Sequence, residues 1–152
     1  MLIKGYDLND ELIVEIGKFA VLWNLFEKNY FGYKCSPKRI MEMCNCISVS
    51  IEKQESLAKA LNDRREWFGQ LYHDFILNGL YSDDRSPAED EINYIEAFLK
   101  QEGNTICGCL LCVSRIRNNM MHGLKDVEKL NSQLEIFKAA NGVLESIKEV
   151  SS

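Results

Sequence analysis

Residues 106–123 read ICGCLLCVSRIRNNMMHG, and this stretch decides the fold because it begins with the most apolar segment of the chain. Ile106, Leu110 and Val113 recur at helical spacing, which predicts a helix. Because the segment is so apolar, we expect neighbouring elements to touch this helix on several sides. The rest of the chain is then interpreted as a scaffold around it.

The helix over residues 106–123 needs a start and an end. Asn104 or Thr105 is a suitable cap for its first turn. Gly123 is expected to take the left-handed conformation that commonly ends a helix. Asp126 is expected to cap one further helix, whose apolar stripe runs over residues 127–147.

Residues 8–30 predict the first helix, because their apolar side chains fall at helical intervals. Asn9 or Asp7 can cap its start, and residues 31–33, Phe-Gly-Tyr, should end it. Its apolar positions are Leu12, Ile16, Phe19, Trp23, Phe26 and Tyr30.

Two serine–proline pairs predict two more helix starts, Ser36-Pro37 and Ser86-Pro87. Proline suits the first helical position because the amide hydrogen it lacks would be unpaired there anyway. The first pair begins a region that is expected to run as one long bent helix or as two helices, with an interruption at Asn62-Asp63 and an end at Asn78-Gly79. The second pair opens a helix that Gly103 should end.

The fold class predicted from these patterns is all-α, an antiparallel bundle of about five helices forming one domain over residues 1–152. The sequence shows no period-two alternation typical of strands. Residues 149–152 are expected to fray. No stretch approaches the roughly 20 apolar residues of a membrane span, and the first residues do not resemble a signal peptide. A cytoplasmic protein is therefore expected.

Charge and cysteine content narrow the function. The net charge of −5 argues against a protein that coats nucleic acid non-specifically. Six cysteines are expected to be thiols in a reducing compartment. Cys107 and Cys109 lie about 200° apart around a helix, so buried structural thiols are favoured over a zinc site. No metal and no cofactor are predicted.

The candidate site is the end of the same stretch, Arg117-Asn118-Asn119-Met120-Met121-His122-Gly123, within a run of residues 103–125 that contains no acidic residue. Arginine grips phosphate through two parallel hydrogen bonds. Histidine exchanges a proton near neutral pH. Together they suggest RNA cleavage without metal, in which the imidazole accepts the 2′-hydroxyl proton and the guanidinium stabilises charge on the phosphate. Asn118 and Asn119 are expected to donate hydrogen bonds to phosphate or to hold the imidazole.

Helix geometry places a condition on this site. Arg117 and His122 are five residues apart, which is roughly 140° around a regular helix. Either the helix unwinds at His122, or two copies of the chain meet so that one substrate contacts side chains of both.

These residues resemble the R-x4-6-H motif of HEPN domains, in the form R-N-N-x-x-H-G-x-K that Lys125 completes. Leu22-Trp23-Asn24-Leu25-Phe26-Glu27 is similar to the W-N-x-x-E pattern of the same group. The resemblance covers nearly the whole chain. It implies a metal-independent, homodimeric endoribonuclease with both motifs in one cleft, often a toxin or defence effector, with a nucleotidyltransferase-like antitoxin in some relatives.

Carried over to this chain, the resemblance implies catalytic roles for Arg117 and His122, with Asn118 as the polar neighbour of the arginine. Asn24 or Glu27 would brace the site. Separately, the positive edge beside the motif predicts RNA contacts, and its members are Arg115, Lys125 and Lys129.

Two alternative interpretations of the motif remain open from the sequence. Arg117 can pair with Glu27 while His122 caps a helix, in which case the motif is only structural. An inactive HEPN module can bind a protein or a nucleotide through the same surface. Elsewhere, His73 is more typical of a helix surface than of a catalyst, and the aromatic residues that follow Arg64-Arg65 are better explained by packing than by stacking on bases.

Overall fold

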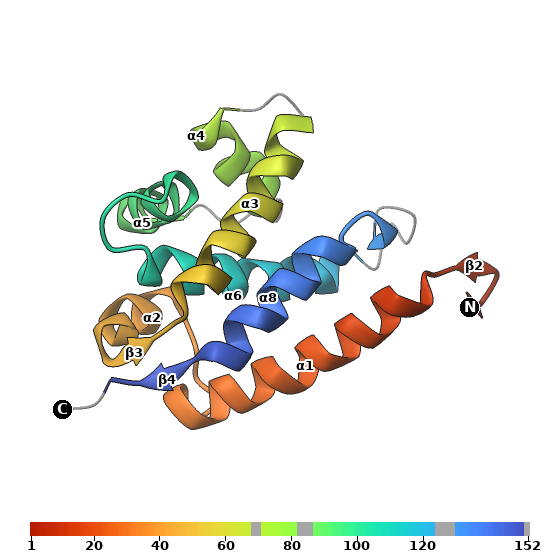
Figure 1. Cartoon of the computed structure of the whole chain (residues 1–152), viewed down its shortest axis with the longest axis horizontal. Helices are drawn as coiled ribbons and strands as arrows, with labels where there is room; N and C mark the ends of the chain where they lie inside the picture. Colours follow the sequence, from red (N-terminus) through yellow and green to blue (C-terminus); the bar gives the residue numbers. More distant parts are fainter. Residues whose placement is uncertain (68–70, 82–86, 124–129, 151–152) are drawn as a thin grey trace.

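The protein is all-α, as the sequence predicts (Figure 1). The structure is a computed structural model that describes residues 1–67, 71–81, 87–123 and 130–150, with only the backbone described at 66, 67 and 121–123. The helices are α1 (Asp10–Phe31), α2 (Pro37–Met43), a 3-10 turn (Cys44–Cys46), α3 (Ile51–Trp67), α4 (Tyr72–Phe75), a π-helical segment (Ile76–Leu80), α5 (Glu89–Lys100), α6 (Ile106–Gly123) and α8 (Leu134–Ser146). The short strands are β1 (Leu2–Ile3), β2 (Tyr6–Asp7), β3 (Ile47–Ser48) and β4 (Lys148–Glu149).

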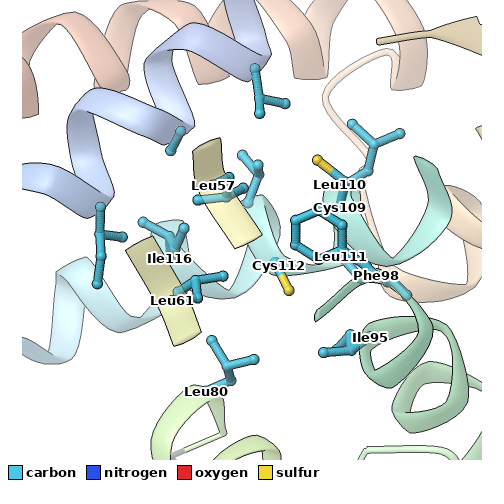
Figure 2. Close-up of a cluster of buried hydrophobic side chains, with 14 of the residues drawn as sticks. Leu57, Leu61, Leu80, Ile95, Phe98, Cys109, Leu110, Leu111, Cys112 and Ile116 are labelled. Carbon is cyan, nitrogen blue, oxygen red and sulfur yellow. The ribbon is translucent and has the colours of Figure 1, made fainter. Parts of the chain in front are cut away.

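Helix α6 is the core helix that the apolar run predicts. Cys109, Leu110, Cys112 and Val113 are all fully buried. Helices α2, α3 and α5 pack against it. Figure 2 shows its side chains among those of the neighbouring elements, and the labelled set is Leu57, Leu61, Leu80, Ile95, Phe98, Cys109, Leu110, Leu111, Cys112 and Ile116.

Helix α1 begins and ends where the sequence predicts. The Asn9 side chain accepts a hydrogen bond from the Leu12 amide at 3.2 Å, and Gly32 takes a left-handed conformation with φ of 54° at the other end. Helix α1 packs along α8, and the two lie side by side in Figure 1. Asn141 of α8 is buried, and its amide donates to the Glu15 carboxylate of α1 at 2.7 Å.

The long helix predicted after Pro37 is broken earlier than expected. Ser36 caps α2 as predicted, but α2 ends at Met43. Strand β3 follows and pairs antiparallel with β4, so the C-terminal residues expected to fray at 149 and 150 are partly held in a ladder. Ser50 then starts α3, since its Oγ accepts a hydrogen bond from the Lys53 amide at 3.4 Å. A strand pair between segments so distant in sequence leaves no local signal.

The expected interruption at Asn62-Asp63 is also wrong, because α3 runs through both residues to Trp67. The Asn62 side-chain amide instead donates to the Leu99 carbonyl of α5 at 2.8 Å, so the residue ties α3 to α5 and does not interrupt the helix. Asn78 and Gly79 do not end a helix either, since both lie inside the π-helical segment.

The predicted boundaries of the later helices are shifted. Helix α5 begins at Glu89, with Ala88 in the cap position and no side-chain cap, and Ser86 lies outside the described residues. It ends at Lys100, where Gln101 adopts a left-handed φ of 55°, two residues before the predicted Gly103. Helix α8 begins at Leu134, and the predicted cap Asp126 lies outside the described residues.

The N-terminal hairpin of β1 and β2 is absent from the predictions. Lys4 and Gly5 form its turn with φ of 47° and 86°. Asn131 anchors it, because its side-chain amide donates to the Asp7 carbonyl at 2.9 Å and its oxygen accepts from the Asn9 amide at 3.0 Å. Among the helices of the described residues, none is long and apolar enough to cross a membrane.

Candidate functional site

A pocket between α1 and α6 brings together residues that the sequence places ninety positions apart. Its volume is about 490 Å³. Helix α6 contributes Arg117 and Met120, whereas the helix α1 residues that line it are Phe19, Ala20, Val21, Trp23, Asn24, Leu25 and Glu27. Arg117, Asn24 and Glu27, all named from the sequence, therefore line one pocket.

The Arg117 side chain is exposed at this pocket. Its Nη1 donates to the Oδ1 of Asn118 at 3.2 Å. Within the described part of the chain Arg117 makes no ion pair, so the structural alternative in which it pairs with Glu27 is not observed. An exposed guanidinium with most of its donors unused is suited to binding an anion such as phosphate.

The opposite face of α6 has a different role. Arg115 and Asn119 are four residues apart, so they share one side of the helix. Both donate to the Leu80 carbonyl at the end of the π-helical segment, Arg115 from Nε at 3.3 Å and Asn119 from Nδ2 at 2.9 Å. This face joins α6 to its neighbour, whereas Arg117 faces the pocket.

The predicted role of Arg115 in RNA binding is wrong. Its side chain is only 1% exposed, and its guanidinium lies 4.2 Å from the centre of the Tyr81 ring. The Tyr81 hydroxyl in turn donates to the buried Glu91 carboxylate at 2.5 Å. A buried arginine with such partners stabilises the interior and is not available to a substrate. The sequence feature that could have placed Arg115 on the side of α6 away from Arg117 is its spacing of four residues from Asn119.

Asn119 also departs from its predicted role, because its amide donates to backbone and not toward the pocket. We expect Asn119→Ala to lower the free energy of unfolding by about 1–2 kcal/mol, since a partly buried hydrogen bond to the Leu80 carbonyl is lost. The neighbouring Asn118→Ala should change it by less than about 0.5 kcal/mol, because the Asn118 side chain accepts its hydrogen bond from the exposed Arg117 and not from a distant part of the fold. Urea denaturation of both variants measures the difference. Equal stability of the two would contradict this assignment.

His122 lies in α6, which keeps a helical backbone through Gly123. The alternative in which the helix unwinds at His122 is therefore wrong, and Gly123 is not the left-handed residue expected after the helix. On a regular helix the His122 side chain leaves roughly 140° away from that of Arg117. The His122 side chain itself, Lys125 and Lys129 lie outside the described residues.

Cys35 lies close to the same pocket, at the turn between α1 and α2. The pKa of its thiol is raised to about 12, chiefly by burial and also by the Glu27 carboxylate, while Arg39 and Arg117 act in the opposite direction. The thiol is therefore protonated at neutral pH, and the reactive thiolate is scarce. Cys35 is thus a neighbour of the site and not a nucleophile.

Four of the other five cysteines fit the prediction of buried thiols, and Cys46 does not. Cys44, Cys107, Cys109 and Cys112 are buried and unpaired, whereas Cys46 is exposed. Burial raises the pKa of Cys109 and of Cys112. In the described residues no three His, Cys, Asp or Glu side chains are grouped as metal ligands.

The sequence did not predict the apolar wall of the pocket. Val21 and Leu25 of α1 are 61% and 46% exposed, and Met120 of α6 lines the same pocket. Val21 and Leu25 both fall outside the buried stripe of α1. Their position in the sequence pattern could therefore have indicated an exposed apolar surface on this helix. No protein-family model, curated protein or solved structure matches this chain.

Proposed function

We propose that this protein is a metal-independent endoribonuclease of HEPN type that acts as a homodimer. The observation that carries the proposal is the position of Arg117. Its guanidinium is exposed, has no acidic partner in the described part of the chain, and lines a pocket with Asn24 and Glu27. A purely structural arginine would be expected to donate hydrogen bonds to other elements of the fold, as Arg115 does to the Leu80 carbonyl.

The proposed reaction uses the two motif residues in separate roles. The His122 imidazole accepts the proton of the ribose 2′-hydroxyl, and the 2′ oxygen attacks the adjacent phosphorus. The bond from phosphorus to the 5′ oxygen breaks, and that oxygen leaves with a proton from solvent. The products are a 2′,3′-cyclic phosphate and a 5′-hydroxyl. Arg117 stabilises the charge that develops on the phosphoryl oxygens.

Helix geometry supports the proposed homodimer. The backbone of α6 is helical through Gly123, and on a regular helix residues 117 and 122 are roughly 140° apart around the axis. A two-fold axis near the end of α6 would bring His122 of one copy to the Arg117 pocket of the other. Each reaction centre would then be built from two chains.

The proposed biological role is that of a toxin or defence effector, with a nucleotidyltransferase-like protein as its antitoxin. This role rests on the resemblance of residues 117–125 to the HEPN motif. A ribonuclease with little non-specific affinity for RNA is consistent with the net charge of −5.

One observation favours a second candidate, an inactive HEPN module that binds a nucleotide or a protein partner. The pocket volume of about 490 Å³ lies within the roughly 300–1,000 Å³ typical of small-molecule sites. Such a module would use the pocket without cleaving RNA.

Incubation of the purified protein with structured and unstructured RNA tests the proposal. Cleavage in the presence of EDTA, with 2′,3′-cyclic phosphate and 5′-hydroxyl ends, is the expected result. His122→Ala should slow it by roughly 100- to 10,000-fold, the usual contribution of a general base. Absence of EDTA-resistant cleavage, or cleavage that persists in both His122→Ala and Arg117→Ala, would refute the assignment.

A further inference from the structure

The pocket between α1 and α6 is lined by both apolar and polar side chains. Val21 and Leu25 are large apolar side chains exposed on α1, and Met120 of α6 lines the same pocket. Covering such exposed apolar area with another apolar surface is favourable, because it removes the area from water. A planar ring is a suitable cover for such a wall.

Two polar side chains of the pocket have unused hydrogen-bonding capacity. Asn24 and Glu27 are three residues apart on α1, so their side chains lie on the same side of the helix. Neither makes a side-chain hydrogen bond or an ion pair to any residue in the part of the chain that the structure describes. Glu27 offers two acceptor oxygens, and Asn24 offers both a donor and an acceptor.

We propose that this pocket binds a guanine base of the RNA substrate, an inference that rests on the proposed ribonuclease function. The Glu27 carboxylate accepts hydrogen bonds from N1–H and from the N2 amino group, and Asn24 donates to O6. The base covers Val21, Leu25 and Met120. Arg117, at the same pocket, holds the neighbouring phosphate.

The choice of guanine follows from the donor pattern of the four bases. A carboxylate only accepts hydrogen bonds, and guanine alone presents two adjacent donors on its Watson–Crick edge. Adenine and cytosine each place a ring acceptor beside the amino group, where it would face the carboxylate. Uracil has a single N–H between two carbonyl oxygens.

The charge of the chain supports recognition through a base. At a net charge of −5, attraction to the phosphate backbone contributes little to affinity. Contacts to one unpaired base can select for RNA sequence, whereas phosphate contacts are the same at every nucleotide. RNA-binding proteins commonly recognise unpaired bases in single-stranded segments.

Calorimetric titration of the full chain with GMP, AMP, CMP and UMP tests the inference. GMP should bind roughly 10- to 100-fold more tightly than the other three, which is the discrimination usual for a paired set of base contacts. Glu27→Gln keeps the size of the side chain but replaces an acceptor with a donor, so GMP should fall to the affinity of AMP. Asn24→Ala should weaken GMP binding by a smaller factor. Glu52→Gln, on the exposed start of α3, is the matched control and should change nothing.

Mapping of cleavage sites on RNA of random sequence separates this inference from the proposed function. Wild type should cut next to guanosine, and Glu27→Gln should cut at a reduced rate without that preference. Cleavage without base preference, together with equal or absent binding of the four nucleotides, would overturn the guanine assignment and leave the ribonuclease intact. The opposite outcome is a protein that binds GMP in a Glu27-dependent manner without cleaving RNA. That result would overturn the ribonuclease proposal and support guanine binding in the pocket.

Discussion

Replacing Arg117 with alanine is expected to lower the rate of RNA cleavage by about 100- to 1,000-fold, which is the usual cost of removing one group that stabilises transition-state charge. The fold should be unaffected, because the side chain is exposed and donates its hydrogen bond to the adjacent Asn118. The free energy of unfolding should therefore change by less than about 0.5 kcal/mol. Single-turnover cleavage rates and urea denaturation of the same preparation measure the two quantities.

Two control variants make the Arg117 result specific. Arg117→Lys keeps the positive charge but loses the planar fork that grips phosphate, so its cleavage rate should fall between wild type and Arg117→Ala. Lys53→Ala removes an exposed positive charge from the groove between α3 and α8, away from the pocket, and should leave the rate unchanged. Wild-type cleavage by Arg117→Ala, or an equal loss in Lys53→Ala, would contradict the assignment of Arg117.

The substitution Gly108→Ala is expected to have the largest effect on stability. A methyl group at this position of α6 would overlap the Tyr94 backbone carbonyl of α5 and lie 2.6 Å from the Phe98 Cβ. A backbone carbonyl in a helix does not move aside as a flexible side chain does, so α5 and α6 must separate. We expect the free energy of unfolding to fall by about 3 kcal/mol or more, at the upper end of the cost of overpacking. Chemical denaturation measures it.

Gly17→Ala is the matched control, because it makes the same substitution in the interior of another helix. No atom lies within 4 Å of the added methyl group. Alanine restricts the unfolded chain and favours the helix, so this variant should gain about 0.5–1 kcal/mol. If Gly108→Ala were as stable as wild type, the close packing of α5 on α6 would be contradicted.

The parts of the fold that the sequence predicts are those with local signals. The apolar run of α6, the Asn9 cap and the Ser36-Pro37 start each depend on residues a few positions apart, and each is confirmed. The break before Ile51 depends on β3 pairing with β4 from the other end of the chain. Such a contact has no local pattern, so the predicted helix ran past its true end.

The candidate site shows the same division. The sequence places Arg117 near Asn24 and Glu27 only through a resemblance, and the structure has all three lining one pocket. Arg115 was misassigned because a charged residue beside a positive edge was expected to be exposed. Its burial depends on Tyr81 and Leu80, more than thirty residues away, which supply the contacts that stabilise a buried guanidinium.

Mixing Arg117→Ala with His122→Ala is the measurement that tests the central claim most directly, because each variant keeps the motif residue that the other lacks. Each variant alone should be almost inactive. After unfolding and refolding together in equal amounts, half of the dimers are mixed, and one of the two composite sites in each is complete. The mixture should recover about a quarter of the wild-type cleavage rate. A mixture as inactive as its components would contradict a site assembled from two chains.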